Sequence, residues 1–375
     1  MMSGLINNHS QQPFQYSAFG TALFVANMAM ESTGGRIFAF QNNQPNHGPG
    51  QIGVRADQTH SMSPTDKEKA LFMPQNNFYQ TLADKMSSSG ISVDLIICPT
   101  LPFIDLVTIG SISSITGGKI YSFFNFSPER DSYNITRMLQ WSLYAPWMFD
   151  VVTRVRVGNG TSLCFLTITG LTLSDFYGNF NMKNATDIEI SRADHNSSLL
   201  VTLKYEGKLK ENETIYIQVA TLYTTQCGDR RIRLINYCLS TTSKVPQIFK
   251  NADLDAYIAL FMRIGLRQVS LSGFSQLRHN FLEHLASILA AYRKLCSSQA
   301  AMGQLILPEG LKLLPIYALS ILKSKVFRDS SDVLVDQRAF HIRGCNRMSC
   351  VELISFLYPN MYHLNISENN VPVVS

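Results

Sequence analysis

Two clusters of arginine are the residues whose types and spacing most clearly suit binding chemistry. Arg154 and Arg156 lie two apart in TRVRV, a stretch that predicts a β-strand, so both side chains project from the same face. Two neighbouring guanidinium groups are well suited to hold a carboxylate or a phosphate. A solvent-facing strand paired with local carboxylates would carry the same residues, so a binding role and a structural role both stay open.

The second cluster, Arg230, Arg231 and Arg233, lies in the segment GDRRIRL. Alternation along a strand places Arg231 and Arg233 on one face, and the two apolar residues of the segment on the other. Asp229 stands directly before them as a local partner for the positive charge. We therefore interpret this cluster as a structural basic strand.

Sequence motifs that could indicate catalysis or a cofactor occur, but the residues around them do not fit such a site. GPGQIG at 48–53 has the letters of a dinucleotide-binding loop, but QNNQPNH separates it from the preceding strand and no helix is predicted directly after it. His279 and His284 are five apart, so they do not share one helix face as a zinc-binding pair would. The seven cysteines form no CxxC pair. The sequence therefore predicts no enzyme, no metal site and no cofactor.

Positive charge is concentrated toward the end of the chain. Residues 1–133 hold 7 Lys and Arg against 9 Asp and Glu (−2), residues 134–243 hold 11 against 9 (+2), and residues 244–375 hold 14 against 9 (+5). A basic half suits an acidic partner surface, which is a lipid headgroup layer or a nucleic acid. A solvated helical face is the plainer interpretation.

The apolar segment at 303–324, GQLILPEGLKLLPIYALSILKS, resembles a membrane span but has the wrong composition for one. A span needs about 20 consecutive apolar residues, whereas Glu309, Lys312 and Pro315 interrupt this segment. We predict a core helix that begins near Glu309, with Pro308 just before it and Pro315 in its first turns or at a kink.

Strand and helix patterns alternate in the first part of the chain. Strands are predicted in GGRIFAF, ISVDLIICP and GGKIYSFFNF, and helices over 65–90, with Thr65 and Glu68 as a capping box, over 101–113 and over 130–147. From about 148 the period becomes two, in FDVVTRVRV, SLLVTLKY, TIYIQVATLYTT and RRIRLINYCLS, which predicts an antiparallel sandwich. After about 245 it returns to 3.6, in LDAYIALFMRIGLR, LRHNFLEHLASILAAYRKL, the 309–324 segment and VDQRAFHIRG.

The predicted fold is therefore a multidomain α+β chain. Its parts are a disordered N-terminus (1–18), a partial α/β trunk of von Willebrand A-like type (19–147), an antiparallel β-sandwich (148–243), an all-α helical domain (244–361) and a stub (362–375).

With this domain order, several motifs resemble the cargo-adaptor subunit of the COPII vesicle coat, the Sec twenty-four family. They are TDKEKALFMPQNNFYQTLA, VDLIICP, GGKIYSF, the RVR pair, DFYGNFNM, ATLYTTQCGDRRIRLINYCLS, AAYRKLCSSQAAMGQLILPEGLKLLPIYALSILKS and LYPNMY. TDKEKALF and GQLILPEGLKLLP are most similar to its C and D class. The resemblance covers roughly residues 20 to 365.

The resemblance implies a coat subunit in transport from the endoplasmic reticulum to the Golgi. Its partners would be the Sec twenty-three subunit, the tails of cargo and SNARE proteins, and the acidic membrane surface, which it would meet from the cytosol. Arg154 and Arg156 fall on the family's Arg-x-Arg pair, which helps to read acidic cargo signals in the A and B class. The C and D class is better known for an Ile-x-Met signal, whose pocket the motifs do not place on residues here.

The same resemblance implies departures from the family pattern. The disordered leader, the zinc-binding module and the front trunk strands are expected to be missing, and the last 14 residues would be the stub of a gelsolin-like domain. The segment between Arg156 and DFYG carries about ten extra residues, with an aggregation-prone LCFLTIT stretch. A nucleic-acid-binding protein and a non-functional truncated paralogue remain the alternatives, and the isolated chain is expected to be poorly soluble.

Overall fold

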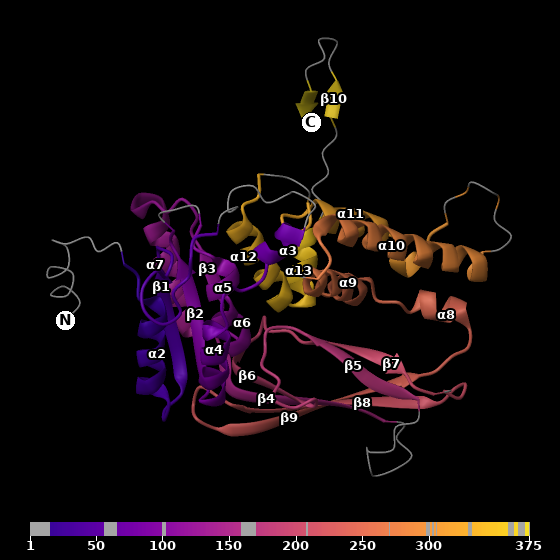
Figure 1. The fold of residues 1–375 in the computed structure, drawn as a ribbon. Coiled ribbons are helices and arrows are strands. Elements are labelled where there is room, and N and C mark those ends of the chain that lie inside the picture. Colours follow the sequence, from indigo (N-terminus) through magenta and orange to yellow (C-terminus); the bar gives the residue numbers. More distant parts are fainter. Residues whose placement is uncertain are drawn as a thin grey trace.

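The structure is a computed structural model, and its elements form an α/β group, a set of antiparallel strands and a group of helices (Figure 1). It describes residues 16–55, 66–99, 103–158, 170–207, 209–269, 271–297, 301, 304, 306–328, 332–358, 364–366 and 372–374. Residues 1–15 of the expected disordered N-terminus (1–18) and the extra segment at 159–169 lie outside these ranges, whereas residues 16–18 are described. A short antiparallel pair, β10 (Leu364–Ile366) and β11 (Pro372–Val374), ends the described chain.

A three-stranded parallel sheet forms the centre of the α/β group. Its strands lie in the order β1 (Gly35–Gln41), β2 (Ile91–Ile97) and β3 (Ile120–Ser122). Every residue of β2 is buried, including the polar Ser92 and Asp94, as expected for a mostly apolar strand in a sheet covered on both faces. The predicted α/β architecture with parallel strands is confirmed.

The helices of this group differ from the prediction in their bounds. They are α2 (Phe19–Met30), α3 (Asp66–Leu71), α4 (Phe78–Ser88), α5 (Leu106–Ile109), α6 (Ser111–Thr116) and α7 (Pro128–Tyr144). The stretch expected to be mostly helical over 65–90 is two helices, because Pro74 lacks an N–H and restricts the residue before it. The expected cap, Thr65, lies outside the described residues. The helix predicted from 101 begins only at Leu106, where the Asp105 side chain accepts a hydrogen bond from the Thr108 N–H.

Six antiparallel strands form the predicted sandwich. They are β4 (Trp147–Gly158), β5 (Leu171–Tyr177), β6 (Asp187–Asp194), β7 (Leu200–Tyr205), β8 (Thr214–Thr224) and β9 (Arg230–Ser240). One sheet has the order β6-β4-β8-β9, and β5 pairs with β7 in the other. Strands β5 and β6 were not predicted. All of edge strand β9 is exposed, including Ile232 and Leu234, and such an exposed apolar edge is a known aggregation hazard.

The helical group contains the helices that the 3.6-residue period predicted, together with two that it did not. The predicted ones are α9 (Leu254–Gln268), α10 (Phe274–Cys296), the short η1 (Glu309–Leu311), α11 (Leu314–Lys323) and α12 (Val335–Arg347), and the others are α8 (Val245–Lys250) and α13 (Cys350–Leu357). Pro308 directly precedes η1 and Pro315 lies in the first turn of α11, as predicted. Of the described helices, none is long and apolar enough to cross a bilayer.

Two of the polar contacts that join the α/β group to the other groups involve a buried aspartate. Asp336 of α12 accepts hydrogen bonds from the backbone N–H groups of Ile104 (2.6 Å) and Leu106 (2.7 Å). Asp194 of β6 forms ion pairs of 2.7 Å with Lys119, just before β3, and with Arg347, at the end of α12. Both aspartates are buried, so these contacts fix how the three groups meet.

Candidate functional site

Arg154 and Arg156 lie on the same face of β4, as the sequence predicted. Val155 and Val157, at the alternate positions, are buried toward the sandwich core, whereas both arginines are only partly buried. Register across the sheet places Gln218 of β8 beside Arg156. The two arginines therefore belong to the outward face of the four-stranded sheet.

The two arginines have different electrostatic surroundings. Arg154 binds Asp187 of the neighbouring strand through two hydrogen bonds, from Nε to Oδ1 (2.5 Å) and from Nη2 to Oδ2 (2.7 Å). These hydrogen bonds and the Asp187 charge raise the pKa of Arg154. Within the described ranges Arg156 takes part in no ion pair. Of the predicted pair, Arg156 is thus the guanidinium that is open to a ligand.

The second arginine cluster has local partners. Register confirms that Arg231 and Arg233 share a face of β9, and Arg231 forms an ion pair of 2.8 Å with Asp229. Arg230 lies on the other face and binds Asp150 at 2.6 Å. These exposed contacts are the geometry expected of a structural basic strand.

The other sequence candidates do not come together as a reactive site. The GPGQIG segment is a loop, as predicted. Gly50 is required there, because its φ is 79° and a Cβ would lie 2.5 Å from the Phe78 ring. His279 pairs with Glu283 at 3.1 Å, while His284 stacks on Phe261 with ring centroids 5.7 Å apart. Among the described residues, no three His, Cys, Asp or Glu side chains lie together as a metal-binding group.

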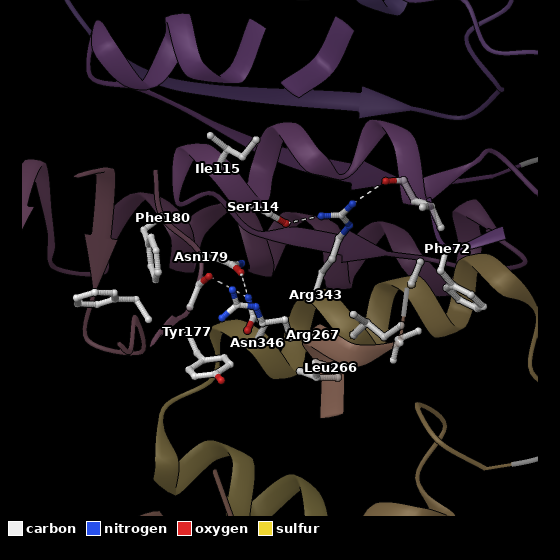
Figure 2. A pocket seen from close by; sticks show the side chains of 16 residues that line it. Phe72, Ser114, Ile115, Tyr177, Asn179, Phe180, Leu266, Arg267, Arg343 and Asn346 are labelled. Atoms are coloured by element: carbon white, nitrogen blue, oxygen red, sulfur yellow. Dashed lines mark hydrogen bonds between the residues drawn. The ribbon is translucent and has the colours of Figure 1, made fainter. Parts of the chain in front are cut away.

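A cavity of about 430 Å³ lies where the three groups of elements meet. Its walls come from α6, from the turn that follows β5, from the end of α9 and from α12 (Figure 2). Phe176, Tyr177 and Phe180 supply aromatic surface, and Leu266 and Ile342 supply aliphatic surface. The cavity therefore combines apolar walls with polar side chains that come from distant parts of the sequence.

Arg343 of α12 is one of the two arginines that line this cavity. It donates hydrogen bonds from Nη1 to the Ser114 hydroxyl and from Nη2 to the Val107 carbonyl, both of 2.6 Å (Figure 2). Burial lowers the pKa of Arg343 to about 10, although the charge of Asp105 acts in the opposite direction. The guanidinium therefore remains protonated at neutral pH. Its hydrogen-bond acceptors are both neutral.

Two more polar groups belong to the cavity rim and wall. Exposed Arg267 binds Asp175 at 2.9 Å, and its guanidinium lies 5.5 Å from the centre of the Tyr177 ring. Asn346 donates from Nδ2 to the Gly178 carbonyl and to the Asn179 Oδ1, both at 2.9 Å. Because the side chain of Arg267 is 57% exposed, the cavity reaches the surface at this residue.

Sequence reasoning missed this cavity entirely. Its polar residues come from separate segments spread between Ser114 and Asn346, and no spacing rule relates these segments. The DFYG segment, which the sequence showed only as a family motif, was the one available signal, because its Gly178 forms part of the wall.

A parallel α/β trunk, an antiparallel sandwich and a helical group, in that order along one chain, define a multidomain α+β protein. Residues 2–143 match the Sec23/Sec24 trunk domain, residues 149–242 the Sec23/Sec24 beta-sandwich domain, and residues 253–355 the Sec23/Sec24 helical domain. The chain belongs to the Sec23/Sec24 family.

Individual relatives agree with this assignment and with the resemblance to the C and D class. The chain is 34% identical to human Sec24C over 89% of its own length, and 33% identical to human Sec24D over 87%. It spans only 29% and 30% of those proteins. The crystal structure of the human COPII-coat protein Sec24c has a TM-score of 0.84 and 31% identity, covering 96% of this chain and 47% of that one.

Proposed function

We propose that this chain acts as a COPII coat subunit that selects cargo for transport from the endoplasmic reticulum to the Golgi, without catalysing a reaction. The observation that carries the proposal is the structural match to the human COPII-coat protein Sec24c over 96% of the chain. A fold shared over that length, at 31% identity, supports a shared role.

The partners follow from the same proposal. The chain would pair with the Sec twenty-three subunit, meet the tails of cargo and SNARE proteins, and lie peripherally on the acidic cytoplasmic face of the endoplasmic reticulum membrane. The excess of positive charge in residues 244–375 supports contact with acidic lipid. No cofactor is part of this proposal.

Arg156, together with Arg154, would read acidic cargo signals. Side chains two apart on a strand lie about 6.6 Å from each other along it, and carboxylates at positions i and i+2 of an extended peptide have the same separation. Arg156 is available directly, whereas Arg154 would have to exchange Asp187 for the ligand. Arg156 therefore supplies the main contact.

The first experiment is co-expression with the Sec twenty-three subunit, followed by size-exclusion chromatography with light scattering. A one-to-one complex is the expected result. A chain that remains unbound or aggregates beside a soluble partner would contradict the pairing.

Cargo reading is tested on the same complex by fluorescence anisotropy. The probe is a labelled peptide Gly-Glu-Gly-Glu-Gly, with Gly-Gln-Gly-Gln-Gly as its neutral control. Arg156→Ala should weaken binding of the acidic peptide by about tenfold, as loss of a charge-assisted contact implies. Arg231→Ala on β9 is the matched control and should leave binding unchanged. Equal effects of these two variants would argue for nonspecific attraction to positive charge.

A further inference from the structure

The cavity at the junction of the three groups is distinct from the β4 arginines, which do not line it. Its volume of about 430 Å³ is within the range of about 300–1,000 Å³ that is typical of ligand sites. Such sites combine apolar walls with a small number of convergent polar groups. The cavity has both features.

The positive charge in the wall has unused hydrogen-bonding capacity. A guanidinium carries five N–H donors, and the two hydrogen bonds of Arg343 to Ser114 and Val107 use two of them. Throughout the described part of the chain, no carboxylate forms an ion pair with Arg343. Arg263 and Arg338 are also buried arginines bound to carbonyl oxygens, but neither of them lines the cavity. Arg343 is therefore placed to bind an anion that enters the cavity.

The two asparagines of the wall favour a peptide as the ligand. The Asn346 Nδ2 group is bound to Gly178 and to the Oδ1 atom of Asn179. In the ranges that the structure describes, Asn179 Nδ2 and Asn346 Oδ1 take part in no hydrogen bond. One free donor and one free acceptor, contributed by adjacent side chains (Figure 2), match the C=O and the N–H of a peptide backbone.

We propose that this cavity binds a short peptide segment in which a carboxylate side chain lies next to a large apolar side chain. The carboxylate would bind the free N–H groups of Arg343. The apolar side chain would pack among Phe176, Tyr177 and Phe180, and the backbone would meet the asparagine pair. Because the cavity is complete within this chain, binding does not require the Sec twenty-three subunit.

The test is fluorescence anisotropy on the 375-residue chain, with a fluorescein-labelled peptide Gly-Phe-Glu-Gly as the probe. Two control peptides change one feature each: Gly-Phe-Gln-Gly removes the charge, and Gly-Ala-Glu-Gly removes the ring. Saturable binding of the first peptide is expected, with about tenfold weaker binding of each control, because each loses one charge-assisted or aromatic contact.

Three variants connect the binding to the cavity. Arg343→Gln should weaken the Phe-Glu peptide about tenfold while leaving the Phe-Gln peptide unchanged. That selectivity separates a lost contact from a lost fold, because unfolding would abolish both. Asn179→Ala, which leaves the bonds of Arg343 intact, should weaken both peptides by a similar factor. Arg156→Ala, outside the cavity, should change neither.

The proposal is overturned if the glutamate and glutamine peptides bind equally, or if Arg343→Gln leaves the preference for glutamate intact. Loss of binding in Arg156→Ala but not in Arg343→Gln would assign the peptide to the β4 face instead. The coat function and the cavity therefore fail separately: pairing with the Sec twenty-three subunit tests the first, and the Arg343 variant tests the second.

Discussion

Asp194 and Asp336, which each link the α/β group to a neighbouring group, are buried carboxylates with opposite surroundings. Asp194 is surrounded by cations, since Lys119 and Arg347 each lie 2.7 Å from it and Arg192 lies at 3.9 Å. Asp336 accepts hydrogen bonds from neutral backbone N–H groups, among them those of Ile104 and Leu106. One junction is thus an ionic network, and the other depends on backbone hydrogen bonds.

This difference sets the pKa values of the two carboxyl groups in opposite directions. Burial acts to raise both. At Asp194 the charges of Arg347 and Lys119 outweigh burial and hold its pKa well below the ordinary value, whereas at Asp336 burial prevails and raises the pKa to about 6. Although both carboxyl groups are buried, Asp194 therefore stays charged at its junction, whereas Asp336 titrates at the other.

The largest effect is expected from Asp194→Asn. Removing this carboxylate leaves Lys119 and Arg347 buried at the junction without a counter-ion, and breaking a buried ion pair from one side typically costs about 3–5 kcal/mol. We expect a loss of this size in the free energy of unfolding at pH 7, measured by urea denaturation. A loss below about 1 kcal/mol, the range of exposed pairs, would mean that water already screens the network.

A somewhat smaller effect is expected from the titration of Asp336. Burial raises its pKa in the folded state to about 6, above the ordinary aspartate range, so its contribution to stability is fully present below about pH 4 and is lost as the pH rises through 6. The loss should be on the order of 2–3 kcal/mol. The quantity to measure is the difference in unfolding free energy between the wild type and Asp336→Asn, from pH 4 to pH 7.

The difference between the wild type and Asp336→Asn is needed because His341 titrates in the same pH range. Burial lowers the pKa of His341 to about 4. The stability that this histidine contributes is therefore present above its pKa in the unfolded state and is lost as the pH falls toward 4, which is the opposite trend. Both proteins carry His341, and its contribution cancels in the difference. A difference that does not change with pH would show that Asp336 stays ionised on folding.

The ionic junction should respond to acid in the opposite sense. The lowered pKa of Asp194 means that its contribution is present at neutral pH and is lost as the pH falls below the ordinary aspartate range. The stability difference between the wild type and Asp194→Asn should therefore stay constant from pH 7 to about pH 5 and shrink below about pH 4. A stability difference that has already vanished at pH 6 would contradict the conclusion that Asp194 is charged in the folded state.

The comparison also shows what the sequence could and could not predict. Strands with a clear pattern were predicted correctly, such as the mostly apolar, wholly buried β2 and the alternating β4. Strand β6 was missed because most of its buried residues are polar: Ser191, together with Arg192 and Asp194, which take part in the ionic network. Helix α2 was missed because FGTALFVANMAM is apolar on most sides and shows little helical period.

The cavity could not be predicted for a different reason. Ser114, Gly178 and Arg343 become neighbours only when the trunk, the sandwich and the helical group have docked. Each local sequence is ordinary for its own helix or turn. Sites built across domain junctions depend on long-range packing, and single-sequence periodicity carries no information about that packing.

The smallest effect is expected at the exposed pair of Arg231 and Asp229, which serves as the reference for both junctions. Their side chains are 60% and 58% exposed, so water and salt screen the attraction, and such pairs contribute between about 0 and 1 kcal/mol. Asp229→Asn should therefore leave the urea midpoint nearly unchanged at every pH from 4 to 7. The ion pair at Asp194 has nearly the same length, 2.7 Å against 2.8 Å. If Asp229→Asn lowered the stability as much as Asp194→Asn, burial would not be what distinguishes these ion pairs. The contrast between the junctions at Asp194 and Asp336 would then lose its physical basis.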